Sequence, residues 1–243
     1  MQDDGFFGEG VAAGYDVGCG EVFSAGDIAA TVDFLATLAQ GGRVLELAIG
    51  TGRIALPLAA RGVEVHGIDL SRAMVDQLRA KPGGESIPVT MGDLSSTRVE
   101  GAFDLVYLVF NTIENLTTQA AQVACFRNAA AHLEPGGCFV VEVEVPDLQR
   151  IPYGETIRPW RATPTRWDFD EYDVVEQGLV SHHFSVVDGS LVQNSIPFRY
   201  VWPAELDLMA ELAGMRRLER WGDWDRRPFT NLSRKHVSVW ESV

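Results

Sequence analysis

The sequence has few cysteines and no long hydrophobic run, and its first residues do not resemble a secretory signal. Its three cysteines among 243 residues are an odd number without C-x-x-C spacing, so neither a disulfide framework nor a zinc finger is predicted. No 18 consecutive residues are all apolar, so no membrane-spanning helix is expected. Residues 1–9 are acidic and lack the basic and apolar regions of a secretory signal. We therefore expect a cytoplasmic protein.

Positive charge is also scarce. The chain has 20 Lys and Arg residues against 34 Asp and Glu residues, a formal net charge of −14. Its longest basic clusters are the pairs 216–217 and 226–227. Such a surface repels phosphate backbones and anionic lipid. Nucleic acids and membranes are not expected as partners, and a neutral or cationic small molecule is.

Apolar strands alternate with helical patterns from residue 43 to residue 145. After a helix at 27–39, strands are predicted at 43–47, 63–68, 87–91, 103–109 and 138–143, with helices at 53–60, 72–80 and 117–133. Runs such as VLEL and FDLVYLVF are apolar almost throughout, which is typical of a parallel sheet covered on both faces.

The pattern changes after residue 145. Antiparallel strands are predicted at 167–176, 179–187 and 191–200, joined by turns that include Asp188-Gly189. A helix at 203–213 and strands at 216–221 and 236–241 follow. The prediction is a single α/β domain over 1–243: an N-terminal arm and helix (1–40), a cofactor-binding core (43–145), an inserted antiparallel β-ribbon lid (157–201) and a C-terminal part (203–243). The seven-stranded sheet is mostly parallel and ends in an antiparallel pair, with helices on both faces.

One strand is followed by a glycine-rich turn, in VLELAIGTGR at 44–53. Gly50 and Gly52 permit a tight turn and the close approach of a ligand. The helix beginning near Arg53 points free N–H groups toward that ligand. Because Gly50-x-Gly52-x-x-Ala55 also fits the dinucleotide fingerprint, an NAD(P)-dependent oxidoreductase is an alternative.

Glu46, just before this turn, helps to separate the two cofactors. Its carboxylate would suit the amino group of a methionine moiety, and it would repel a pyrophosphate by on the order of 1 kcal/mol. Asp69, at the end of the second strand, could accept both hydroxyls of a ribose, which either cofactor has. No Tyr-x-x-x-Lys pair of an oxidoreductase is found.

Five segments, taken together, carry a family resemblance. ELAIGTGR, GIDLS, MGDL, FDLVY and LEPGG occur in this order from residue 43 to about residue 143. They resemble the motif series of class I S-adenosylmethionine-dependent methyltransferases, except that Ala48 replaces the first glycine of the usual E-x-G-x-G-x-G. The later segment WPAELDLMAELAGM is similar to a late helix of that family. The resemblance implies a Rossmann-like fold, S-adenosyl-L-methionine as cofactor and S-adenosyl-L-homocysteine as product.

The resemblance also implies a cofactor site drawn from several segments. The methionine end would involve Tyr15, Glu46, Ala48, Gly50, Gly52 and Arg53. Asp69 would hold the ribose and Phe110 would flank the sulfonium. The adenine would lie against Leu70, Met74, Asp93 and Leu94. Two alternatives remain: Asp93 as a turn or helix cap, and Tyr15 as simple packing of the N-terminal arm.

The methyl acceptor is less defined. Segment 109–115 lacks the Asn/Asp-Pro-Pro-Tyr/Phe run that grips planar nitrogens, and no acidic metal cluster is evident, so neither base or glutamine methylation nor a metal is predicted. Candidate substrate-binding residues are Asn111, Glu114, Glu144, Tyr200 and Trp202. His182 and His183 are neighbours on a predicted strand, so only one can face the acceptor and act as a base. Surface or core positions are the alternative for both.

These observations predict methyl transfer to an amine or hydroxyl of a small molecule by in-line displacement, in a monomer or homodimer. The layout resembles methyltransferases that act on aminosugars or peptide antibiotics in bacterial secondary metabolism. Besides the oxidoreductase, a non-catalytic S-adenosylmethionine-binding protein stays open.

Overall fold

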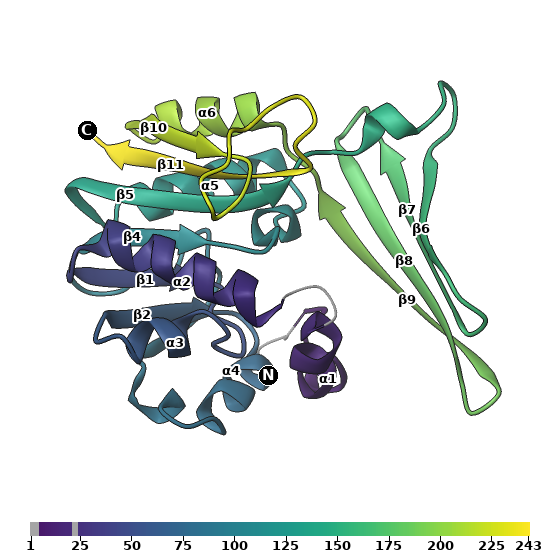
Figure 1. Cartoon of the computed structure of the whole chain (residues 1–243), viewed down its shortest axis with the longest axis horizontal. Helices are drawn as coiled ribbons and strands as arrows, with labels where there is room; N and C mark the ends of the chain where they lie inside the picture. The colour runs from purple at the N-terminus through teal and green to yellow at the C-terminus, as the bar shows by residue number, and fades with distance from the viewer. Residues whose placement is uncertain (1–4, 21–23) are drawn as a thin grey trace.

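The molecule contains two β-sheets that lie side by side (Figure 1). The computed structural model describes residues 5–20 and 24–243, with the side chains of residues 17–20 left out. The larger sheet has seven strands in the order β10-β11-β5-β4-β1-β2-β3. The smaller one has four strands in the order β6-β7-β8-β9.

The seven-stranded sheet confirms the predicted fold class. Every neighbouring pair in it is parallel except the two pairs that β11 makes. Its strands are β1 (Arg43–Leu47), β2 (Glu64–Asp69), β3 (Val89–Met91), β4 (Phe103–Leu108), β5 (Leu133–Glu144), β10 (Met215–Trp221) and β11 (Lys235–Ser242). Because the parallel strands run in the same direction, the carboxyl ends of β1, β2 and β4 meet at one edge, where such sheets bind ligands.

Helices cover both faces of this sheet. On one face, α2 (Ala25–Ala39) and α3 (Ala55–Ala59) supply buried residues such as Phe34 and Leu58. On the other, α5 (Gln119–Ala130) and α6 (Pro203–Leu212) supply Phe126 and Met209. The remaining helices are α1 (Glu9–Gly20), α4 (Arg72–Arg79) and the short 3-10 turns η1 (Gly84–Ser86), η2 (Thr112–Asn115) and η3 (Leu148–Arg150).

The four-stranded sheet is the predicted insertion, with one strand more than expected. It consists of β6 (Ile157–Ala162), β7 (Arg166–Asp173), β8 (Gly178–Val187) and β9 (Ser190–Arg199), all antiparallel. Strand β6 was not predicted, because its sequence IRPWRA lacks alternation and contains Pro159. Proline is tolerated there because β6 is an edge strand that pairs on one side only.

Three predicted boundaries were wrong. The helix expected at 117–133 ends at Ala130, and the Pro-Gly-Gly segment belongs to β5, where the register with β4 shifts after the pair Phe103 and Leu133. The helix expected at 53–60 covers only Ala55–Ala59. Residues 9–20 of the predicted arm form α1. The division into domains stays a prediction. Among the described residues, no helix is long and apolar enough to cross a membrane.

Candidate active site

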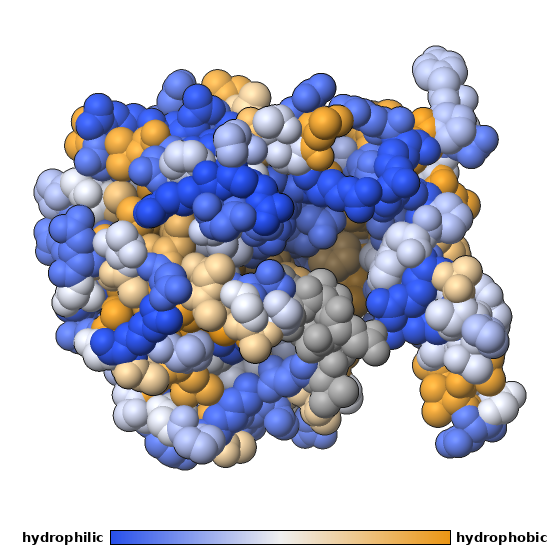
Figure 2. Space-filling model, viewed as in Figure 1, coloured by the Kyte–Doolittle hydropathy of each residue, from blue (hydrophilic) through white to orange (hydrophobic). Residues whose placement is uncertain are grey.

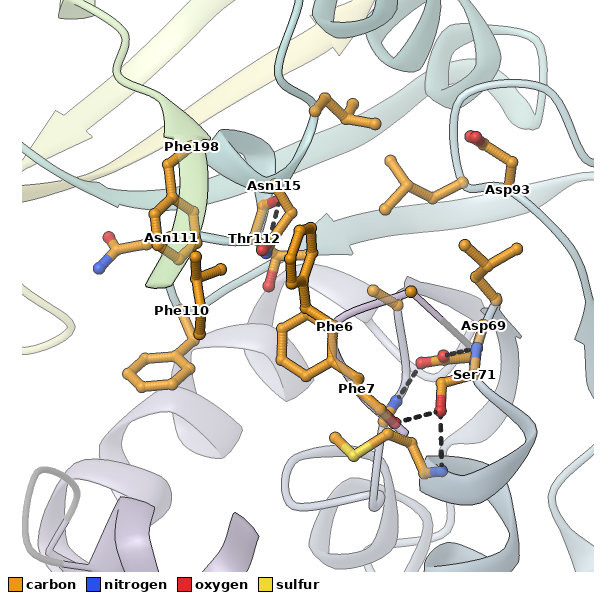
Figure 3. A pocket seen from close by; sticks show the side chains of 18 of the residues that line it. Phe6, Phe7, Asp69, Ser71, Asp93, Phe110, Asn111, Thr112, Asn115 and Phe198 are labelled. Atoms are coloured by element: carbon orange, nitrogen blue, oxygen red, sulfur yellow. Dashed lines mark hydrogen bonds between the residues drawn. The ribbon is translucent and has the colours of Figure 1, made fainter. Parts of the chain in front are cut away.

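A cavity of about 430 Å³ opens at the carboxyl edge of the parallel strands, within the size range of small-molecule sites (Figure 3). Its walls come from the N-terminal segment, the β1 and β2 turns, η2 and β9. The lining residues are Gly5, Phe6, Phe7, Tyr15, Ala48, Gly50, Asp69, Leu70, Ser71, Met74, Asp93, Leu94, Phe110, Asn111, Thr112, Asn115, Leu116, Ile196, Pro197 and Phe198. Figure 2 shows a hollow between the two sheets, with hydrophobic surface at its back and hydrophilic side chains around it.

The turn after β1 places bare backbone at the cavity wall. Ala48, Gly50 and Gly52 all have positive φ, at 58°, 54° and 75°. An alanine in this left-handed region costs about 1–2 kcal/mol, so Ala48 holds a conformation that favours glycine at an energetic cost. A Cβ atom on Gly52 would lie 2.2 Å from Cδ1 of buried Leu78. Gly52 therefore serves close packing behind the turn, and it does not line the cavity.

Asp69 joins the two cofactor-side turns. Its carboxylate accepts hydrogen bonds from the Gly50 amide at 2.6 Å and the Ser71 amide at 2.8 Å, and its residue is 7% exposed. Beside it, Leu70 is 41% exposed at the cavity wall, and Met74 and Leu94 extend this apolar surface. A fixed carboxylate next to an apolar wall suits a molecule in which a sugar with hydroxyl groups is attached to a flat ring. These residues therefore fit an adenosine group.

Asp93 lines the same wall, but one of its oxygens is already used. Its Oδ1 accepts hydrogen bonds from the Ser95 amide at 2.7 Å and the Ser95 hydroxyl at 2.6 Å. Asp93 therefore caps a turn, as the alternative had it. Contact between its other oxygen, Oδ2, and an adenine amino group stays a prediction.

Aromatic side chains form another part of the cavity wall. The Arg53 guanidinium lies 4.6 Å from the ring centre of Phe110 and 5.5 Å from that of Tyr15. Phe7 contacts Tyr15 edge to face at 6.3 Å, and its carbonyl accepts a hydrogen bond from the Ser71 hydroxyl at 2.7 Å. Phe6 and Phe7 line the cavity but were not predicted to do so, because no local pattern shows that residues so early in the chain reach the β2 turn.

Glu46 lies behind the cavity. It is 4% exposed, it does not line the cavity, and its Oε2 accepts a hydrogen bond from the Tyr107 hydroxyl at 2.7 Å. Burial raises the pKa of Glu46 to about 8, although the Tyr107 hydrogen bond and nearby Arg53 oppose this rise. Contact between Glu46 and a methionine amino group stays a prediction.

The acceptor end is formed by η2 and β9. Asn111 lines the cavity, and its Oδ1 accepts a hydrogen bond from the Glu144 amide at 2.7 Å. Glu114 follows in η2 and is 7% exposed. Opposite them, Ile196, Pro197 and Phe198 of β9 complete the wall, and the sequence analysis named none of these three.

Six of the seven predicted acceptor-side residues, all except Asn111, do not line the cavity. The Nδ1 atoms of His182 and His183 lie 2.9 Å from the Ser195 hydroxyl and 3.1 Å from Asp168, respectively. Tyr200 is 2% exposed and packs 5.7 Å from the Tyr172 ring, with Trp202 on its other side. A catalytic role for either histidine stays a prediction without support from this placement.

No metal cage is found in the described part of the chain, where no three His, Cys, Asp or Glu side chains are arranged to hold an ion. Cys125 is buried, Cys138 is half-buried, and both are free; the side chain of Cys19 lies outside the described residues.

The comparisons with known proteins agree with this geometry. A family profile described as a methyltransferase domain matches residues 44–137. The solved CcbJ methyltransferase from Streptomyces caelestis is 37% identical, covers 99% of both chains and superposes with a TM-score of 0.88. The cypemycin N-terminal methyltransferase of a Streptomyces species is 28% identical over 83% of this chain and 84% of its own length. CalS10, an amino pentose methyltransferase from Micromonospora echinaspora solved with S-adenosylmethionine, shares the fold with a TM-score of 0.72 at 20% identity, over 95% and 97% of the two chains.

The chain therefore belongs to the S-adenosylmethionine-dependent methyltransferases. The predicted family and cofactor are confirmed, and the oxidoreductase alternative is set aside.

Proposed function

We propose that this methyltransferase methylates a nitrogen atom of a small secondary metabolite held between η2 and β9. The observation that carries the proposal is the single cavity, which extends from Asp69 and Asp93 at one end to Phe198 at the other. Phe110 and Asn111 line it as well. One continuous space can therefore hold a methyl donor and an acceptor together.

The residues present would hold the cofactor in a defined direction. Asp69 would accept the ribose hydroxyls, and Leu70, Met74 and Leu94 would contact the adenine. Arg53, beside Tyr15, would complement the negative methionine carboxylate. When bound, S-adenosylmethionine supplies a methyl group on a positively charged sulfur, which departs as a neutral thioether.

This chain's own contribution would be placement. Methyl transfer is fast when the acceptor atom is held about 3 Å from the methyl carbon and in line with the sulfur. Four phenylalanines line the cavity, which limits competing water: Phe6, Phe7, Phe110 and Phe198. A neutral amine needs no strong base, which is consistent with the distance of the histidines from the cavity wall.

Three observations favour nitrogen over oxygen. The chain carries a net charge of −14, which attracts cations. The cypemycin relative is named for N-terminal methylation. A second relative, from Saccharopolyspora spinosa, is named as the N,N-dimethyltransferase of a dTDP-aminosugar and is 28% identical over 60% of this chain and 49% of its own length.

The test measures S-adenosylhomocysteine formation with pairs of acceptors that differ only in carrying an amine or a hydroxyl. Turnover is expected with amines. With an active amine, Phe198→Ala should raise KM about 10-fold through lost apolar contact, leaving the affinity for S-adenosylhomocysteine unchanged. Leu191→Ala, 65% exposed on the same strand, is the matched control. Turnover with hydroxyls alone, or a Phe198→Ala defect confined to the cofactor, would contradict the proposal.

A further inference from the structure

The two sheets of the described chain have four edge strands, and three of these edges are protected against pairing with another strand. Strand β3 is only three residues long. Strands β6 and β10 each contain a register shift, and both carry arginines, such as Arg158 on β6 and Arg217 on β10. Short length, irregular register and charge are features that keep an exposed edge from pairing. The fourth edge strand, β9, has none of these three features from Ser190 to Phe198.

Strand β9 is long, regular and uncharged along its edge. Its ten residues pair with β8 in an unbroken antiparallel register, from Ser190 opposite Val187 to Arg199 opposite Gly178. Residues 190–198, SLVQNSIPF, contain no charged side chain, although the chain as a whole has a net charge of −14. In the described part of the chain, β8 is the only strand with which β9 pairs. The other edge of β9 therefore offers backbone groups to an additional strand.

The turn between β8 and β9 shows which residues of β9 have outward-facing backbone groups. Asp188 and Gly189 both have positive φ, at 49° and 76°, as in a two-residue type I′ hairpin turn. In such a hairpin the flanking residues, Val187 and Ser190, exchange both backbone hydrogen bonds, and bonded pairs then alternate with non-bonded pairs. The backbone groups that point away from β8 are therefore those of residues 191, 193, 195 and 197. Pro197 agrees with this assignment, because its missing N–H costs no hydrogen bond to β8.

The open edge of β9 leads into the cavity. Ile196, Pro197 and Phe198 are consecutive, and all three line the cavity. Because neighbouring side chains on a strand point to opposite faces, three lining residues in a row indicate that the cavity meets the strand at its edge. Away from the cavity the strand becomes more exposed, from half-buried at residues 195–198 to exposed at residues 191–194. In Figure 1, β9 is also the strand of its sheet that lies nearest to the seven-stranded sheet. A molecule in the cavity can therefore continue along this edge.

The outward backbone groups of β9 suit an extended peptide. Gln193 and Ser195 each present one N–H donor and one C=O acceptor, spaced two residues apart as in any extended strand. No backbone hydrogen bond joins either residue to a described element outside the four-stranded sheet. Gln193 and Pro197 are four residues apart, about 14 Å along a strand, so a peptide of about six residues would reach from the cavity past Gln193.

The direction of β9 determines which end of such a peptide enters the cavity. The last residues of β9 line the cavity and its first residues lie beyond it, so β9 runs toward the cavity. A peptide that continues the antiparallel order of this sheet runs away from the cavity and places its N-terminus inside. An N-terminal amine has an ordinary pKa of about 8, so much of it is neutral near that pH and no strong base is needed. A parallel peptide would place a carboxylate there, which offers no nitrogen.

We propose that β9 binds a short peptide as an antiparallel fifth strand of its sheet, so that the methyl acceptor is the N-terminal nitrogen of a peptide. This inference rests on the proposed function and names the class of its acceptor. The backbone of Gln193 and Ser195 pairs with the peptide backbone. Because main-chain hydrogen bonds do not depend on side chains, peptides of different sequence bind in the same way.

The test titrates two peptides, Ala-Thr-Val-Thr-Val-Thr amide and the dipeptide Ala-Thr amide, into protein saturated with S-adenosylhomocysteine. The hexapeptide should bind at least about 10-fold more tightly, because only it reaches Gln193. Its backbone amides are then N-methylated one at a time. Methylation at alternate positions, those that face β9, should remove the gain, and methylation at the positions between them should leave it. A dipeptide that binds as tightly as the hexapeptide, or equal losses at all positions, would overturn the inference.

Gln193→Pro tests the same contact from the protein side. It removes an outward N–H at a position where, as at Pro197, no hydrogen bond to β8 is lost. Affinity for the hexapeptide should fall about 10-fold, and affinity for the dipeptide should not change. Val174→Pro, 67% exposed in the turn between β7 and β8, is the matched control. Melting temperatures show whether both variants keep the sheet, and if Gln193→Pro does not fold, the methylated peptides decide.

Light scattering tests for the other occupant of this edge, a second copy of the chain. A dimer that Gln193→Pro dissociates and that does not bind the hexapeptide would overturn the inference, because β9 would then pair with β9 of the second copy. Methylation of simple amines without preference for the hexapeptide over the dipeptide would also overturn it and would leave the proposed function standing. Failure to methylate any amine would instead contradict the proposed function.

Discussion

The cofactor end and the acceptor end of the cavity each have a buried glutamate nearby, and the two glutamates differ in their partners. Glu46 accepts a hydrogen bond from Tyr107 and lies behind the glycine turn. No described residue donates a hydrogen bond to Glu114, and the charges of Glu144 and Asp170 contribute to its raised pKa. Both have raised pKa values, chiefly because of burial.

The difference shows what each end is built to do. At the cofactor end, the Gly50 and Ser71 amides hold Asp69, and the Tyr107 hydroxyl holds Glu46. At the acceptor end, Glu114 is 7% exposed, and no described residue donates a hydrogen bond to its carboxyl group. Three substitutions at the cofactor end test whether its glycine turn is closely packed, whether Glu46 is buried in its neutral form, and whether Asp69 binds the cofactor.

The largest expected effect is that of Gly52→Ala. The new Cβ atom would lie 2.2 Å from Cδ1 of Leu78 at a φ of 75°, and Leu78 is fully buried, so its side chain would have to shift within a packed core. Backbone strain and overpacking together should lower the free energy of unfolding by about 2–5 kcal/mol, measured by urea denaturation.

Gly62→Ala is the matched control for this substitution. Its φ is 84°, but nothing lies within 4 Å of the added Cβ atom, so it should show only the backbone cost of about 1 kcal/mol. Equal losses in the two variants would show that close packing behind the turn is unimportant.

Glu46→Gln tests the paired glutamate through pH. The pKa of Glu46 rises from 4.5 in the unfolded chain to about 8 in the folded protein. The folded state therefore binds more protons between these values, and stability falls as pH rises through this window. Glutamine cannot ionise, so Glu46→Gln should gain on the order of 3 kcal/mol relative to the unchanged protein between pH 5 and pH 9. Parallel stability curves from denaturation at the two pH values would contradict this.

The smallest expected effect is that of Asp69→Asn. Losing charged hydrogen bonds to ribose hydroxyls should weaken S-adenosylhomocysteine binding by about 2 kcal/mol, or roughly 30-fold, by calorimetry. The control is Asp76→Asn, a similar change at an exposed position on α4. If Asp69→Asn binds normally, Asp69 only fastens the two turns together and does not hold the cofactor.

Much of the cofactor end could be predicted because its residues belong to short motifs. Ten predicted residues line the cavity: Tyr15, Ala48, Gly50, Asp69, Leu70, Met74, Asp93, Leu94, Phe110 and Asn111. Each of the last nine ends or follows a parallel strand, and the carboxyl ends of such strands meet at one edge. Glu46, Gly52 and Arg53 belong to the same motif but lie behind or beside the cavity. Sequence spacing places a residue in a turn without showing where its side chain points.

The acceptor end could not be predicted to the same depth. Asn111 and Glu114 were named as candidates, whereas Phe6, Phe7 and residues 196–198 were missed. These residues meet only because the N-terminal segment and β9 fold back over the sheet edge. His182 and His183 show the converse: polar residues on a predicted strand suggested a base, but each faces partners within the four-stranded sheet.

By itself, the sequence determined the alternation of strands and helices, the glycine turn and the family, because hydrophobic periodicity and turn chemistry act over a few residues. Only the tertiary structure decided which carboxyl groups are satisfied. Glu46 and Tyr107 are 61 residues apart in the sequence. Glu114 belongs to the short helix η2, and Asp170 belongs to β7 of the four-stranded sheet. Whether a buried charge has a donor depends on contacts between such distant segments, which no local pattern encodes.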